Sequence, residues 1–178
     1  MTTYAYIGID PGITPTICKN VGNNVEFKTL PVPTMTQLAV TYEESKDWWV
    51  EARRYRTLKF LLKRYLKSIP YNLIIGVETL AYSKTFRAGM MGKVELAILD
   101  TLYELDRATA MLVFQITPQQ WKKHVVGKGN AGKEAVSEFL HDNYPHMPRT
   151  PNLNHTDAFA IALTVKHIYM EAMNDKTD

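Results

Sequence analysis

An apolar run at residues 73–77 constrains the fold of this chain more than any other feature. It follows a helical pattern that Pro70 ends, and it stops abruptly at Glu78. A continuous apolar run of this length is typical of a strand that is buried on both faces of a parallel sheet. A parallel strand needs a crossover connection, and the preceding helix can supply it. We therefore expect a sheet that is at least partly parallel.

The remaining patterns predict a mixed α/β sandwich in a single domain. Residues 4–9 form an expected first strand that ends at Asp10-Pro11-Gly12, and residues 16–21 and 25–30 flank a turn at Gly22 as a hairpin. Residues 111–116 are a further buried-strand candidate. Helical spacing of apolar residues begins at Thr57, at Val94 and at Ala158, and shorter helices are expected at residues 121–125 and 133–142. At 178 residues, the chain has the length of one domain.

Composition excludes several classes of protein. The single cysteine cannot form an intramolecular disulfide or a thiolate zinc site. The sequence has no basic leader, and no run of about 18 apolar residues that would suggest a membrane span. We therefore expect no membrane partner and a location in the cytoplasm of a bacterial or phage-infected cell. The net charge is only +3, so any case for an anionic partner depends on where the cations cluster.

Three acidic residues stand where a sheet could bring them together. Asp10 and Glu78 end two strands, and the carboxyl ends of neighbouring parallel strands form the edge at which open α/β sheets bind ligands. Asp157 is expected in the first turn of the terminal helix. Taken singly, Asp10 has an ordinary explanation as a turn former and Asp157 as a residue of the first helical turn. Glu78 is less ordinary, because a carboxylate buried at the end of an apolar strand needs a compensating partner. Together they suit hard cations such as Mg²⁺ or Mn²⁺ and indicate two-metal phosphodiester hydrolysis.

Four ordered blocks of sequence carry a family resemblance. They are Ile-Gly-Ile-Asp10-Pro-Gly, the strand ending in Glu78, the stretch from Trp121 to Lys133, and the closing His155-Thr-Asp157-Ala-Phe-Ala. With these blocks the chain resembles the RuvC-type Holliday junction resolvases of the RNase H-like superfamily. The resemblance implies an RNase H-like mixed five-stranded sheet flanked by helices. It also implies a single RuvC-like nuclease domain over residues 1–178.

The resemblance also implies a catalytic site. Asp10, Glu78 and Asp157 match the metal-binding acids of the family, and Lys122 and Lys133 match lysines near the scissile phosphate. Two ions, Mg²⁺ or Mn²⁺, are implied for each active site.

The family has an Asp or a His three residues before its last acid, whereas this chain has Asn154 there and His155 one place later. Asn154 shares a helical face with Asp157, whereas His155 points about 200° away. We expect Asn154 to complete the metal site, with His155 as its rival if the helix begins only at Thr156.

Further residues are candidates for contact with DNA. The segment after Glu78 mixes aromatic and basic side chains, which can stack on unpaired bases and bind phosphates. The glycine-bearing loop at residues 127–132 leads into a helix N-terminus that could attract phosphate. A dense basic run spans residues 53–67, and it could be an ordinary solvated face or a surface for a DNA arm. Trp48 and Trp49, in the segment 34–52, have no assigned role. The DNA-binding candidates are Tyr82, Lys84, Phe86, Arg87 and Lys128.

The function implied is that of a homodimeric, metal-dependent endonuclease that binds four-way or branched DNA and resolves it by paired symmetric cuts. Two alternatives stay open. One is an RNase H-like nuclease for hybrid or flap substrates, which needs the acids but no symmetric dimer. The other is a branched-DNA-binding protein without cleavage, which the uncharged Asn154 would favour.

Overall fold

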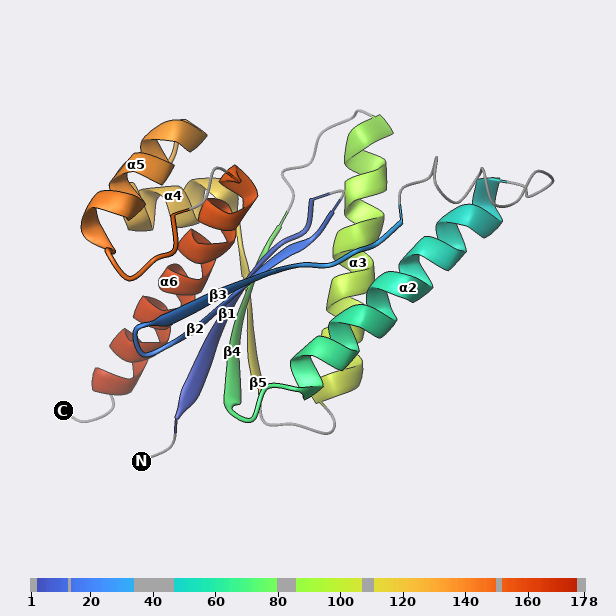
Figure 1. Cartoon of the computed structure of the whole chain (residues 1–178), viewed down its shortest axis with the longest axis horizontal. Helices are drawn as coiled ribbons and strands as arrows, with labels where there is room; N and C mark the ends of the chain where they lie inside the picture. Colours follow the sequence, from blue (N-terminus) through green and yellow to red (C-terminus); the bar gives the residue numbers. More distant parts are fainter. Residues whose placement is uncertain are drawn as a thin grey trace.

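The structure is a computed structural model of the whole chain, shown in Figure 1. It describes residues 3–12, 14–33, 47–79, 86–106, 111–149 and 152–175, with the side chains at 47–50 and 86–91 excepted. Within these residues, three strands come first, then two helix–strand pairs, then three helices. This is the order that the sequence patterns predict.

The described strands form one mixed five-stranded sheet in the order β3-β2-β1-β4-β5. β1 (Tyr4–Asp10), β2 (Thr16–Val21) and β3 (Asn24–Thr29) are antiparallel neighbours, and Gly22 turns the hairpin at a φ of 62°. β4 (Asn72–Glu78) and β5 (Met111–Ile116) are added in parallel beside β1. The strand ending in Glu78 is therefore an interior strand with a parallel neighbour on each side, as the apolar run predicts.

Helices cover both faces of the sheet (Figure 1). α2 (Asp47–Lys67) and α3 (Phe86–Asp106) pack on one face and enclose a core with Ile7, Ile75 and Leu62. α4 (Pro118–Val126), α5 (Lys133–Asn143) and α6 (Leu153–Asn174) lie on the other. Within the part of the chain that the structure describes, no helix is both long and apolar enough to span a membrane.

α6 approaches the sheet unusually closely at one point. A Cβ atom on Gly8 would lie 1.9 Å from the carbonyl oxygen of Ala158, so only glycine fits there. Gly8 stands two residues before Asp10 in β1, and Ala158 directly follows Asp157 in α6. This glycine contact therefore holds Asp157 against the carboxyl end of β1.

Three helices begin earlier than the sequence patterns indicate. α2 starts at Asp47 rather than Thr57, α3 starts at Phe86 and runs through the glycines at 89 and 92, and α6 starts at Leu153 rather than near Ala158. The apolar periodicity marks only the turns that pack on a core, and at α6 the turn before them consists mostly of polar residues behind the cap at Asn152, which carries no such signal. The expectation that Asp157 lies in the first turn of α6 is consequently wrong, because it lies one turn further in.

Candidate active site

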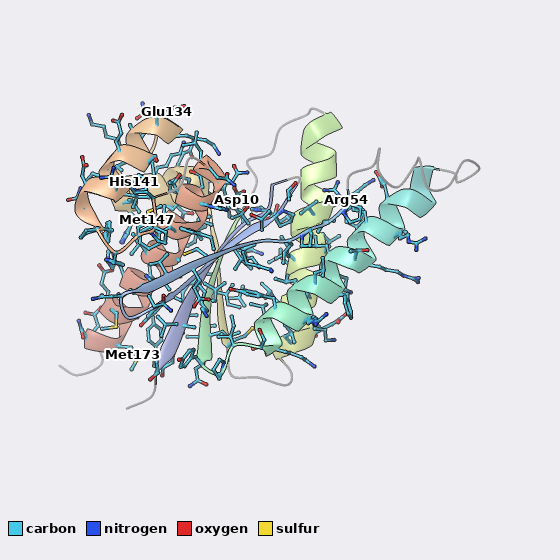
Figure 2. The ribbon with its side chains drawn as sticks, in the orientation of Figure 1. Asp10, Arg54, Glu134, His141, Met147 and Met173 are labelled. Carbon is cyan, nitrogen blue, oxygen red and sulfur yellow. The ribbon has the colours of Figure 1, made fainter. Side chains whose placement is uncertain are left out.

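One cleft gathers the acids that the sequence singles out. Asp10 ends β1, Glu78 ends β4, and Asp157 comes from the amino-terminal part of α6. Figure 2 shows Asp10 at the end of the sheet where α6 begins. The cleft has a volume of about 430 Å³ and is lined by Asp10, Gly12, Thr14, Glu78, Pro118, Trp121, Lys122, Lys133, Asn154 and Asp157.

Asp10 is buried in surroundings that disfavour its ionised form. Its side chain is largely enclosed, and its Oδ1 accepts a hydrogen bond of 3.1 Å from the backbone N–H of Gly12. Burial, reinforced by the negative charge of Asp157, raises the pKa of Asp10 to about 6, although Lys133 and the Gly12 N–H act in the opposite direction. A cation placed beside Asp10 would relieve this penalty.

Glu78 is positioned by a tryptophan. The indole Nε1 of Trp121 donates a hydrogen bond of 3.0 Å to Oε2 of Glu78. Trp121 is itself fixed, because it is buried in α4, which begins with a capping box between Thr117 and Gln120. Burial and the charge of Asp10 raise the pKa of Glu78 to about 7, despite the indole hydrogen bond that favours the ionised form.

Asp157 is the most deeply buried of the three acids, and Lys133 is its partner. The Nζ of Lys133, at the first position of α5, donates a hydrogen bond to Oδ2 of Asp157. Oδ1 of Asp157 is buried and has no hydrogen-bond partner among the residues that the structure describes. Burial alone would lower the pKa of Lys133, but the bond to Asp157 and the charges of all three acids outweigh it and raise that pKa.

Asn154 and His155 lie on different sides of α6. The helix starts at Leu153, with Asn152 as its N-cap, so both residues are subject to helical geometry. Asn154 lines the cleft with Asp157. The His155 ring instead stacks on Phe27 with centroids 4.7 Å apart, and its Nε2 lies 3.3 Å from the hydroxyl of Thr29. Of the two rivals, only Asn154 faces the acids.

The predicted DNA-binding residues are only partly placed. Lys122 lines the cleft, whereas Lys128 is exposed on the loop after α4 and does not line it. Tyr82 and Lys84 lie outside the described residues. Phe86 and Arg87 belong to the first turn of α3, and their side chains lie outside the description as well.

Sequence reasoning missed two groups that orient the acids. Trp121 was part of the family-like block, but nothing in its type or spacing indicated a bond to Glu78. The backbone N–H of Gly12 is also a donor to the site. The Asp-Pro-Gly turn gives a signal for it, since an aspartate side chain often accepts from the N–H two residues on.

Comparison with known proteins shows which fold the chain adopts. The sequence matches no protein-family model, and no curated protein sequence is significantly similar to it. A Thermus thermophilus RuvC structure superimposes with a TM-score of 0.63 at 21% identity, covering 97% of each chain. The chain has the fold of RuvC. T. thermophilus RuvC in complex with Holliday junction substrate superimposes with a TM-score of 0.66 at 18% identity, covering 97% of this chain and 96% of that one.

The match to RuvC confirms the predicted RNase H-like mixed sheet and the resemblance at the level of the fold. At 18–21% sequence identity, this likeness establishes the fold alone.

Proposed function

We propose that this protein is a metal-dependent endonuclease that binds four-way or branched DNA and resolves it by paired symmetric cleavage. The observation that carries the proposal is the convergence of Asp10, Glu78 and Asp157 on one cleft together with Lys122 and Lys133. A group of three carboxylates is suited to binding metal cations, and the two lysines are suited to binding a phosphate of the substrate. A RuvC fold that spans nearly the whole chain supports the same function.

The donor set fits a hard divalent cation. The described residues contain no preformed group of three Asp, Glu, His or Cys side chains close enough to hold an ion. The charge of Asp157 nevertheless raises the pKa of Asp10, and the charges of Asp10 and Asp157 raise the pKa of Glu78. The ammonium of Lys133 is bonded to Asp157 beside them. Two features would be relieved by a cation: Oδ1 of Asp157, which has no hydrogen-bond partner within the described residues, and the raised pKa values of Asp10 and Glu78.

In the proposed site Asp10, Glu78, Asp157 and Asn154 hold Mg²⁺ or Mn²⁺, with two ions per active site. Such ions activate a water for in-line attack and stabilise the leaving oxygen. Lys133 sits beside the acids at the start of α5, where its charge and the helix N-terminus both attract a phosphate. Lys122 also lines the cleft, and we propose that it binds a phosphate of the same substrate.

The DNA contacts outside the cleft are proposed from the sequence. Lys128 is exposed on the loop between α4 and α5, a position that suits contact with the phosphate backbone of DNA. Tyr82, Lys84, Phe86 and Arg87 follow Glu78 directly and are proposed to meet the branch point. A branched substrate is supported by the RuvC structure that holds a Holliday junction.

Paired cuts require two active sites, and we propose a homodimer. The outward face of α3 carries two large exposed side chains, Leu96 at 67% and Tyr103 at 63%. They stand seven residues apart, so they lie on one side of the helix. Leu112 and Val113 on the edge strand β5 are exposed as well. Apolar side chains of this size favour burial against a second copy.

A panel of substrates tests the proposal against its two alternatives. We expect the protein with Mg²⁺ or Mn²⁺ to cut a four-way junction in two strands of like polarity, and to leave an RNA–DNA hybrid and a flap largely intact. Preferential cutting of the hybrid or the flap would favour an RNase H-like nuclease. Tight junction binding without nicking in either metal would favour a binding protein.

A further inference from the structure

The outward side of α2 carries a distinctive set of side chains. Among residues 51–67, whose side chains the structure describes, the exposed ones follow a spacing of three, four, four and three. That spacing confines them to one stripe of the helix. We call this stripe the basic face of α2, and it consists of Arg53, Arg56, Phe60, Arg64 and Lys67.

The other lysines of α2 are already neutralised. Lys59 bonds to Asp100 at 2.5 Å and to Glu104 at 2.8 Å, and Lys63 bonds to Glu104 at 3.2 Å. These acids belong to α3, so positive charge on the side of α2 that faces α3 is compensated within the protein. Within the described part of the chain, Arg56, Arg64 and Lys67 have no such ion pair. The paired lysines therefore lie on the side of α2 that faces α3, whereas Arg56, Arg64 and Lys67 lie on its exposed side.

A helix C-terminus accounts for only part of the basic face. Arg64 and Lys67 lie in the last turn, where cations interact favourably with the helix dipole. That effect does not reach Arg56, which is more than two turns from the end of the helix.

Solvation of the cations does not explain why Phe60 is part of this face. Its side chain is 63% exposed although it stands in the middle of the cations. The exposed phenyl ring leaves apolar area that a bound ligand can cover, at a point where cations stand on both sides of it. The pattern indicates a ligand that is both anionic and aromatic.

The spacing suits a nucleic-acid strand with unpaired bases. Arg56 and Arg64 flank Phe60 at four residues on either side, which is about 6 Å at 1.5 Å per residue. Exposed aromatic rings stack on unpaired bases, and neighbouring cations bind the phosphates of the same strand. An intact duplex exposes no base faces along its sides. Its phosphates would bind the cations, but none of its bases would stack on the phenyl ring.

We propose that the basic face of α2 binds a single DNA strand, with a base stacked on Phe60 and phosphates on Arg56, Arg64 and Lys67. α2 lies on the opposite side of the sheet from α6 (Figure 1), and its basic face shares no residue with the cleft. The surface is therefore a second DNA-binding site, beyond the proposed nuclease function. It would hold a displaced or unpaired strand while the cleft acts on another.

The first test measures binding of fluorescent (dT)20 in EDTA by anisotropy at several salt concentrations. We expect Arg56→Gln combined with Arg64→Gln to weaken binding by at least about tenfold and to flatten the salt slope by about 1.4, or 0.7 for each phosphate contact. The matched control is Lys59→Gln with Lys63→Gln, which removes the same charge from the same helix and should change affinity less than twofold. Equal losses in the two pairs would overturn the proposal, because net charge alone would then explain the binding.

The second test separates stacking from charge. Phe60→Ala should weaken (dT)20 binding by about tenfold, Phe60→Trp should restore it, and neither should affect binding of a 20-bp duplex. Unchanged (dT)20 binding by Phe60→Ala would overturn the proposal. So would the loss of self-association by this variant in light scattering, which would assign the face to a second copy of the chain. Because binding is measured in EDTA, a failure to cleave junctions would contradict the proposed function alone.

Discussion

Lys133 donates a hydrogen bond to Asp157, the acid that is most deeply buried in the cleft. The bond joins the first turn of α5 to α6 and places an ammonium among three carboxylates. A lysine in this position can neutralise the acids before a metal binds and turn to the substrate phosphate afterwards. In the proposed enzyme it therefore links metal binding to phosphate binding.

Replacing Lys133 tests this double role. Lys133→Ala is expected to slow junction cleavage, because a charge beside the phosphate is lost, and to flatten the salt dependence of junction binding by about one unit of slope. Lys123→Ala is the matched control, since Lys123 is exposed on α4 and does not line the cleft. If Lys133→Ala leaves both the rate and the slope unchanged, Lys133 makes no contact with the substrate.

The protonation of Asp10 and Glu78 predicts how stability depends on pH without metal. Their folded pKa values of about 6 and about 7 lie above the ordinary values of 3.8 and 4.5. The folded state therefore holds protons that the unfolded chain releases. This contribution to stability is fully present below about pH 4 and is lost as the pH rises through 6 to 7.

Thermal unfolding in EDTA checks this dependence. Asp10→Asn should raise the Tm at pH 8, by a few degrees for a contribution on the order of 1–3 kcal/mol, and should change it little at pH 4. Asp142→Asn, which removes an exposed acid from α5, is the control for net charge. A Tm of Asp10→Asn that is lower than the native value at pH 8 would contradict the predicted repulsion among the acids.

Metal titrations distinguish Asn154 from His155. Asn154→Asp adds a carboxylate on the wall of the cleft and should lower the Mg²⁺ concentration for half-maximal cleavage, whereas Asn154→Ala should raise it. His155→Ala should have the smaller effect, because that ring stacks on Phe27. A larger loss from His155→Ala would reverse the assignment. A fall in activity below pH 7 would not decide the matter, since protonation of Asp10 and Glu78 predicts the same fall.

The proposed dimer is tested by a change on the outward face of α3. Tyr103→Glu places a charge where apolar contact is expected and should convert the protein to a monomer in light scattering at micromolar concentration. Junction cuts should then become unpaired nicks. Glu95→Gln lies on the same helix and is the control. A native protein that is monomeric both alone and on a junction would refute the dimer.

The sequence predicts the sheet well and the helix starts poorly. The limits of β2 and β5 match the expected ones, because both are short runs that contain residues typical of strands, such as Ile17 and Val113. The start of α6 lies one turn before its apolar face, at the cap Asn152, which the apolar pattern does not mark. That missed cap kept His155 as a candidate, because a helix starting at Thr156 would have freed its side chain to reach the acids.

The acids of the site were predictable because two of them end strands, and topology alone brings strand ends together. The hydrogen bonds that orient these acids were not predictable from the sequence. Trp121 reaches Glu78 across a separation of 43 residues, and Lys133 reaches Asp157 across 24. Such pairs depend on how α4, α5 and α6 pack, and no local pattern in the sequence encodes that packing.

The most direct test of the central claim is cleavage of a labelled four-way junction by acid variants in a series of Mg²⁺ and Mn²⁺ concentrations. Asp10→Asn, Glu78→Gln and Asp157→Asn should each lose at least about two orders of magnitude in rate and keep junction binding, because metal ligands stabilise charge in the transition state whereas phosphate contacts supply the affinity. Asp142→Asn should cleave normally. Near-native cleavage by any of the three would remove that acid from the site, and near-native cleavage by all three would contradict the proposed metal centre.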